Sequence, residues 1–268
     1  LLHPAQKMII LFAGPFFNII LAFLLYIVIA FLGESKLAAV VGEIAPNSAA
    51  QSANLQSGDK ILAINGVQIQ SFEEISKQVR AEPLLLSIKR GEQVLQITLT
   101  PQLGKGYNDF MQETEKPLIG ISPNGERVKV YHKGFESLSY AFYQSVDSSL
   151  LIVKGLAKLI TGEIDSKNLG GVIMMTDITS KATERGLVVV LLITALISIN
   201  LGVLNLLPIP ALDGGRLVGV MLTTAIEAIT HKKLNPKIEG YIHGVGMVLL
   251  LILMGLIMFK DIIFAIKG

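Results

Sequence analysis

The 268-residue sequence contains no cysteine and no tryptophan. The absence of cysteine excludes disulfide bonds and thiol catalysis, and it says little about the compartment. Charge is also scarce, because Asp, Glu, Lys and Arg together make up 16% of the chain and leave a net charge of +2. Lysine and arginine are scattered and form no dense basic block, so the sequence gives no reason to expect a nucleic-acid partner.

Charged residues are rarest in three long apolar stretches, residues 8–32, 187–207 and 240–259, and the first two contain none. About 20 apolar residues are enough for a helix to cross the hydrocarbon core of a bilayer. The whole chain is 51% apolar with a mean hydropathy of +0.58, which is too apolar for a soluble domain of this size. Residues 8–32 are also too long for the apolar core of a signal peptide. We therefore expect a multi-pass α-helical membrane protein with the lipid bilayer as a partner.

Between the first two stretches, residues 40–101 change to a mixed polar composition with strand-like alternation. This pattern is typical of a folded α+β domain that lies outside the membrane and is inserted between the spans. The local signals predict strands at 60–64 and 67–69 around an Asn65-Gly66 turn, a helix from a Ser71–Glu74 capping box to about Arg80, and a hairpin of residues 84–90 with 94–100.

Two further segments connect this domain to the second span. Residues 104–133 are polar and rich in glycine and proline, which indicates a linker with one short strand at 118–122. From Leu138 onward, apolar residues recur every three or four positions, so residues 134–185 should begin with an amphipathic helix that lies against the membrane surface or the spanning bundle. The glycines of residues 161–179 indicate that the chain then folds back toward the second span.

Loop charges predict the orientation. Lys7 precedes the first span, and the short connection after Asp213 carries Arg216 and Lys232 among its basic residues, so both should be cytoplasmic. The inserted domain then lies on the outer side. Residues 217–229 hold Glu227 and are too short to cross the bilayer, which indicates an interfacial helix.

The second span ends in an element with special chemistry, Asn-Leu-Leu-Pro-Ile-Pro-Ala-Leu-Asp-Gly-Gly-Arg. Pro208 and Pro210 break the helix, and the freed carbonyls are tolerated only where they face protein or a water-filled cavity. Asp213 in such a cavity is costly, and a bound cation is the simplest way to recover that cost. The alternative is that Asp213 is an exposed N-cap of a helix starting near Leu217, with Gly214 and Gly215 making the turn.

Two asparagines and a second interruption accompany this element. Asn200 and Asn205 are five residues apart, so they do not share one face of an unbroken helix, and at least one is expected in the unwound part. Their side-chain amides either hold an extended substrate strand or form hydrogen bonds to neighbouring helices. In the first span, Pro15 removes a helical hydrogen bond, Gly14 allows close helix approach, and Asn18 follows one turn later.

These motifs, together with Gly58-Asp59-Lys60-Ile61 and Leu159-Ile160-Thr161-Gly162-Glu163, resemble the bacterial site-2 protease family of zinc intramembrane proteases, in order along the whole chain. The resemblance implies a circularly permuted PDZ-like domain at residues 37–103, in the periplasm of a bacterium, with the spans in its inner membrane. It also implies that zinc is held by two histidines of a His-Glu-x-x-His helix and by the aspartate that corresponds to Asp213.

The sequence departs from the family pattern at the zinc helix. Its four histidines are His3, His132, His231 and His243, none is followed by Glu, and no two are four residues apart. The family places that helix upstream of the Gly14-Pro15 span, so we expect that the two histidines and the general-base glutamate precede this sequence. On this interpretation the chain alone is inactive.

The resemblance implies a zinc-dependent endopeptidase that cleaves transmembrane helices of single-span proteins, such as anti-sigma factors or remnant signal peptides, with Asn200 and Asn205 as substrate contacts. The alternative functions are a non-catalytic membrane-tethered PDZ module or degenerate protease homologue, and a transporter element. The expected segments are residues 1–33 (first span), 37–103 (PDZ-like), 104–133 (linker), 134–185 (amphipathic helix and re-entrant segment), 186–216 (second span), 217–239 (interfacial) and 240–268 (third span).

Overall fold

The computed structural model describes residues 3–110, 112–163, 186–209, 211–231, 240, 244–248, 251–252 and 255. The chain forms two compact units, one of Leu1–Phe31 with Lys133–Gly268 and the other of Leu32–His132. The chain thus leaves the first unit near the end of its first helix and returns to it about 100 residues later, so the second unit is an insertion, as the change in composition predicted.

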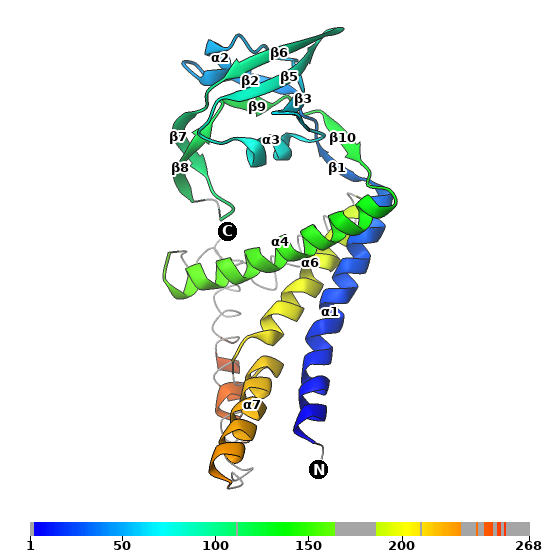
Figure 1. Ribbon diagram of the computed structural model, residues 1–268, viewed down its shortest axis with the longest axis vertical. Coiled ribbons are helices and arrows are strands. Elements are labelled where there is room, and N and C mark those ends of the chain that lie inside the picture. The colour runs from blue at the N-terminus through cyan, green and yellow to red at the C-terminus, as the bar shows by residue number, and fades with distance from the viewer. Residues whose placement is uncertain are drawn as a thin grey trace. The chain divides into compact units, whose positions relative to one another are not determined.

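The inserted unit is built on a four-stranded antiparallel sheet with the order β4-β3-β5-β6 (Figure 1). Alternate residues of these strands point into one apolar core, in which Ile61, Leu86 and Ile88 are fully buried. Two helices contribute Ala50 and Ile75 to the same core. The bounds are β3 Lys60–Ile64, β4 Val67–Gln68, β5 Leu84–Arg90, β6 Gln93–Leu99, α2 Ala49–Ser52 and α3 Phe72–Gln78.

The local predictions in this unit agree with the structure. Asn65 and Gly66 both have positive φ, 51° and 82°, and they join β3 to β4 as the turn signal predicted. Residues 84–90 pair with the following strand over its whole length. The predicted helix is present and ends at Gln78, but its capping box is not formed: the Glu74 carboxylate accepts the Gln70 N–H at 2.9 Å and the Ser71 hydroxyl, and Ser71 caps no backbone N–H.

The linker prediction for residues 104–133 was wrong, because this segment is mostly strand. Its last two strands pair with partners that are distant in sequence: Glu34 lies opposite Val130, and Val41 lies opposite Pro123. The pairs are β1 Glu34–Leu37 with β10 Arg127–Val130, β2 Val41–Ile44 with β9 Ile121–Pro123, and β7 Gln102–Tyr107 with β8 Glu113–Leu118. The segment therefore completes the inserted unit.

The helices of the other unit whose bounds the structure describes are α1 Pro4–Leu32, α4 Phe135–Ile160, α6 Leu187–Leu206 and α7 Asp213–Thr230. Residues 244–248 are helical as well. Among the described residues, α1 and α6 are long and apolar enough to cross a membrane. The third expected span, 240–259, and the re-entrant part of 134–185 lie largely outside the described residues, so they stay predictions.

Helices α1 and α6 pack against each other through side chains and are antiparallel (Figure 1). The contact is closest at Gly202, where an added Cβ would lie 2.9 Å from the Ile19 side chain and 3.0 Å from the Pro15 carbonyl oxygen. The Ser198 hydroxyl donates to the Asn18 carbonyl oxygen at 2.7 Å. Small residues spaced four apart on α6 thus bring the two backbones together, as is common between membrane helices.

Helix α4 packs on this pair through a face of small and polar residues. Ser137, Ser145 and Ser148 are buried there, and the Ser148 hydroxyl is hydrogen-bonded to the Tyr26 hydroxyl at 3.1 Å. The predicted apolar stripe lies beside this face and is exposed, as Phe142 and Val146 illustrate. The structure therefore decides one alternative: the stripe does not pack on the described part of the bundle.

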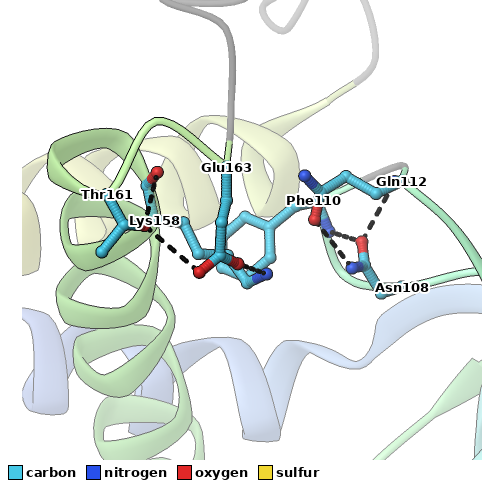
Figure 2. A network of polar contacts seen from close by, with 6 residues as sticks. All are labelled: Asn108, Phe110, Gln112, Lys158, Thr161 and Glu163. Atoms are coloured by element: carbon cyan, nitrogen blue, oxygen red, sulfur yellow. Dashed lines mark hydrogen bonds and ion pairs between the residues drawn. The ribbon is translucent and has the colours of Figure 1, made fainter.

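The end of α4 is fixed by a Schellman motif in the Thr-Gly-Glu segment. Gly162 has φ of 75°, its N–H donates to the Leu159 carbonyl, and the Glu163 N–H donates to the Lys158 carbonyl at 2.9 Å. Figure 2 shows how Lys158 and Thr161 also bind the Glu163 carboxylate, at 2.8 and 3.2 Å.

Figure 2 also labels three residues of the β7–β8 turn in the inserted unit. In this turn the Asn108 side chain accepts the N–H groups of Phe110 and Gln112.

Candidate functional site

The candidate site begins where α6 ends. The helix is regular to Leu206, and Leu207 turns to an extended conformation with ψ of 145°, as expected for a residue that precedes proline. The Ile209 N–H then donates to the Leu207 carbonyl at 2.7 Å, across Pro208, and the Leu212 N–H donates to the Ile209 carbonyl at 2.9 Å. Pro208 is exposed. Two tight turns therefore replace the helix, while Pro210 lies outside the described residues.

Both asparagines lie inside α6, so the expectation that at least one belongs to the unwound part was wrong. Pro208 restricts the residue before it to an extended conformation, so the helix ends at Leu206 and Asn205 stays in its last turn. Asn200 and Asn205 are half-buried, and neither side chain has a hydrogen bond within the described part of the chain. Their amides are thus free to bind another group.

Asp213 is the first residue of α7, and its side chain is half-buried. The N-cap of the helix is Leu212, and no side chain caps the helix, so the interpretation of Asp213 as an N-cap was wrong. The helix also starts four residues earlier than the predicted start near Leu217. In the regions that the structure describes, the Asp213 carboxylate has no hydrogen bond or ion pair, although the first turn of a helix favours a negative charge.

The glycine after Asp213 fixes this turn against α6. Gly214 is buried, and an added Cβ would overlap the carbonyl oxygens of Leu206 and Leu207. Only glycine permits this approach of the α7 backbone to the end of α6. Gly215 follows in the same turn and is half-buried. The Gly214 contact thus holds Asp213 beside the helix break.

The Gly14-Pro15 pair, which the continuous helix α1 accommodates, lies next to Asp213. A Cβ at Gly14 would be 3.8 Å from the Asp213 Oδ2 atom, and Pro15 is buried against α6. The structure therefore brings together the Gly14-Pro15 motif and the Asp-Gly-Gly motif, which are about 200 residues apart in sequence. Asn18 is also drawn into this contact through its carbonyl, which binds Ser198.

Sequence reasoning missed two residues that assemble the site, Ser198 and Gly202. Ser198 is buried and holds α6 to α1 by its hydrogen bond, and Gly202 allows the close approach at Pro15. The available signal was their spacing, because small residues four apart on one helix face are typical of a helix–helix contact within a membrane.

One carboxylate alone does not make a zinc site. Catalytic zinc has three protein ligands and an open position for water. Within residues 3–163 and the later described segments, no group of three His, Cys, Asp or Glu side chains is placed to hold a metal ion. Asp213 has the donor chemistry and the free lone pairs of a zinc ligand, so it fits as one member of a larger set.

Comparisons with known proteins agree with this chemistry. Residues 2–253 match the family described as Peptidase family M50. A Campylobacter jejuni protein named as an inferred zinc metalloprotease is 53% identical over 262 residues, which are 98% of this chain and 70% of the relative. The zinc metalloprotease RasP of Geobacillus kaustophilus is 35% identical over 267 residues, 96% of this chain and 59% of RasP.

Among solved structures, the PDZ domain of HtrA3 bound to a phage-derived ligand matches with 36% identity and a TM-score of 0.24, covering 25% of this chain and 61% of that one. The family match spans nearly the whole chain and includes both motifs that meet at Asp213. The chain therefore belongs to peptidase family M50, the site-2 protease family that its motifs resemble.

Proposed function

We propose that the full-length protein is a zinc-dependent intramembrane endopeptidase in which Asp213 is one of the metal ligands. The observation that carries the proposal is the position of this carboxylate: it is half-buried, it lies beside Gly14 of an apolar helix, and no described group neutralises it. A metal ion is the simplest partner for such a charge. The zinc metalloprotease names of the relatives support the choice of zinc.

The His-Glu-x-x-His helix that would supply the remaining ligands is not in this sequence, in which no two of the four histidines are four residues apart. We propose that a His-Glu-x-x-His helix outside this sequence supplies two imidazoles and the general-base glutamate. The relatives are longer than the chain, which leaves room for such a helix. Bound zinc would acidify a water molecule until it is a nucleophile near neutral pH. Residues 1–268 alone are then expected to bind zinc weakly and to cleave nothing.

The residues of this chain would orient the metal and the substrate. Gly214 sets the position of Asp213 by its contact with the end of α6. A transmembrane substrate hides its peptide bonds in its own hydrogen bonds, so cleavage requires a locally extended segment. The free amides of Asn200 and Asn205 are proposed to bind the main chain of that segment, in place of the hydrogen bonds that it loses.

The same proposal assigns the membrane arrangement. Helices α1 and α6, with residues 240–259, would span the inner membrane of a bacterium, and the inserted unit would lie in the periplasm, on the side opposite the basic segment that begins at Arg216 in α7. Substrates would be single-span proteins such as anti-sigma factors or remnant signal peptides. The inserted PDZ-like unit would either bind a new C-terminus by strand addition or exclude substrates that have not been shortened outside the membrane.

The experiment compares zinc content in the full-length wild-type protein with that of the Asp213→Ala variant. We expect loss of one of three ligands to lower metal affinity by more than about 100-fold, since even second-shell changes cost 10–100-fold, and to abolish cleavage of a single-span substrate. Asp147→Ala on the exposed face of α4 is the matched control and should keep both properties. Unchanged zinc content in Asp213→Ala would contradict the ligand assignment.

A non-catalytic tethered module is the competing function. It is favoured by the absence of a complete ligand set among the described residues. If the wild-type full-length protein, purified without chelators, contains no zinc and cleaves no single-span substrate, the tethered module is the better description.

A further inference from the structure

A main-chain carbonyl near Asp213 has lost its helical donor. Pro15 lies inside α1, and proline has no N–H group, so the carbonyl oxygen of Leu11 lacks the donor that residue i+4 supplies in a regular helix. The proline ring also displaces the carbonyl four residues before it. Pro4, the other proline of α1, is at the first helical position, where its missing N–H has no partner to bind.

The freed carbonyl belongs to the turn of α1 that lies against the candidate site. That turn runs from Leu11 to Pro15 and carries Gly14, whose added Cβ would lie 3.8 Å from the Asp213 Oδ2 atom. Leu11 is half-buried and Gly14 is exposed, whereas Pro15 is buried against α6. The absence of a side chain at Gly14 leaves the backbone of this turn open next to Asp213.

An apolar environment makes an unpaired carbonyl costly, since a lost hydrogen bond is not replaced by water. An extended peptide segment presents main-chain N–H groups that have lost their own acceptors. The two deficits are complementary. We propose that the Leu11 carbonyl oxygen, freed by Pro15, accepts a hydrogen bond from a main-chain N–H of the substrate segment that is extended beside Asp213. This inference rests on the proposed protease function, and it makes the Gly-Pro pair a substrate-binding element as well as a packing element.

The Leu11 carbonyl differs from the proposed asparagine contacts. Asn200 and Asn205 present side-chain amides from α6, whereas the Leu11 carbonyl is a main-chain group of α1. A main-chain acceptor binds the peptide group of the substrate and does not depend on its side chains, so this contact is available to substrates of different sequence. Its position in the rigid turn next to Asp213 sets the register of the substrate relative to the metal ligand.

The test is the Pro15→Ala variant of the full-length protein. Alanine restores an N–H at position 15, which can bind the Leu11 carbonyl within the helix and so occupies the proposed acceptor. We expect kcat/KM for a single-span substrate to fall about 3- to 10-fold, the effect of one hydrogen bond, while zinc content stays unchanged and thermal stability is equal or higher. Pro4→Ala is the matched control, because it adds an N–H without occupying a freed carbonyl, and it should cleave like the wild type.

A second measurement identifies the substrate group. In a series of substrates, each main-chain N–H within about four residues of the cleaved bond is replaced in turn by an ester oxygen, and each substrate is cleaved by both enzymes. One ester should slow the wild type about 3- to 10-fold and have no further effect on Pro15→Ala, because the variant has already lost that contact.

The outcomes separate this inference from the proposed function. Wild-type cleavage with no ester effect above twofold overturns the inference, even if Pro15→Ala proves unstable. Multiplicative ester and Pro15→Ala effects overturn it as well, since the N–H and the carbonyl are then independent. A wild type that lacks zinc and cleaves nothing contradicts the proposed function instead.

Discussion

The buried charge of Asp59 is the strongest single-residue feature of the inserted unit. Its side chain is 1% exposed, and Arg90 binds both carboxylate oxygens at 2.7 Å while the Gln56 N–H donates at 2.8 Å. Burial raises the pKa of the Asp59 carboxyl, but these hydrogen bonds and the attraction of the guanidinium outweigh it and hold the pKa below its ordinary value. The pair is therefore satisfied, and removing one partner should be costly.

The lowered pKa makes the stability of this unit depend on pH. A carboxyl whose pKa is lower in the folded state stabilises the fold above its unfolded pKa, near 3.9, and this stabilisation is lost as the pH falls through the folded pKa. Urea unfolding of residues 32–132 should show that Asp59→Ala lowers the free energy of unfolding by about 3 kcal/mol at pH 7. The difference between the two proteins should shrink below about pH 4. Glu92→Ala, in an exposed pair with Lys89, is the control and should change little.

Gly214 allows a prediction about the site itself. Alanine at this position would overlap the carbonyl oxygens of Leu206 and Leu207, so α7 must move away and take Asp213 with it. In the full-length protein we expect Gly214→Ala to lower zinc content and thermal stability together. Gly219→Ala, one turn later in the same helix with nothing near its added Cβ, should keep the zinc and gain up to about 1 kcal/mol from helix propensity. Equal zinc content in the two variants would show that the Gly214 contact does not position the carboxylate.

Sequence alone identified the special residues of the site but not how they meet. Asp213 was recognisable because it is the first charge after a long apolar run, and Pro15 because it interrupts one. The contact between Gly14 and Asp213 depends on how α1 packs on α6, and glycine carries no side-chain signal for its partner. Packing through Gly202 and Ser198 decides that contact, and only the structure contains it.

Helices and strands were predicted correctly where local interactions determine them, and were missed where contacts between distant parts of the sequence do. The β3–β4 turn was predicted because Asn65 and Gly66 are compatible with positive φ in any context. The strands of residues 104–133 were missed because glycines and Pro117 argue against strand in a local window. Two of them form because distant partners bind them, β10 with β1 and β9 with β2. In the local β7–β8 hairpin, the Lys116 side chain covers Gly106.

Helix α4 has three faces, and three consecutive residues sample them. Val146 lies on the exposed apolar face, Asp147 on the exposed polar face, and Ser148 on the face that packs on Tyr26. An interfacial helix beside a bundle requires this arrangement, with one face each for lipid, water and protein. The periodicity predicted the helix but not which face packs, since the packed face is made of serines.

The prediction for α4 uses spin labels on single cysteines at these three positions, in a sequence that has no cysteine of its own. In lipid nanodiscs the label at position 146 should be more accessible to oxygen than to a water-soluble nickel complex, and the label at 147 should show the reverse. The label at 148 should be poorly accessible to both reagents, because the position is buried. Higher nickel than oxygen accessibility at 146 would exclude lipid contact for the apolar face.

At the scale of the whole molecule, the inserted unit has the features of a domain that folds alone. Residues from both ends of the unit pack in one core, for example Val41 from β2 and Ile119, which follows β8. Both chain ends leave through one antiparallel pair, in which Glu34 lies opposite Val130. Excision at these ends therefore cuts no pairing within the unit.

The boundaries of that domain give a direct comparison of structure with sequence. A fragment of residues 32–132 should unfold in one cooperative transition, whereas the fragment 37–103 that the sequence predicted should not. The shorter fragment lacks β9, the partner of β2, and it lacks Ile119, whose carbonyl accepts the Ala50 N–H at 2.8 Å and whose buried side chain alone contributes about 2–3 kcal/mol. Urea unfolding followed by circular dichroism distinguishes the two. A cooperative transition of the shorter fragment would show that the core does not require the strands after Tyr107. The prediction of a linker in this region would then be correct.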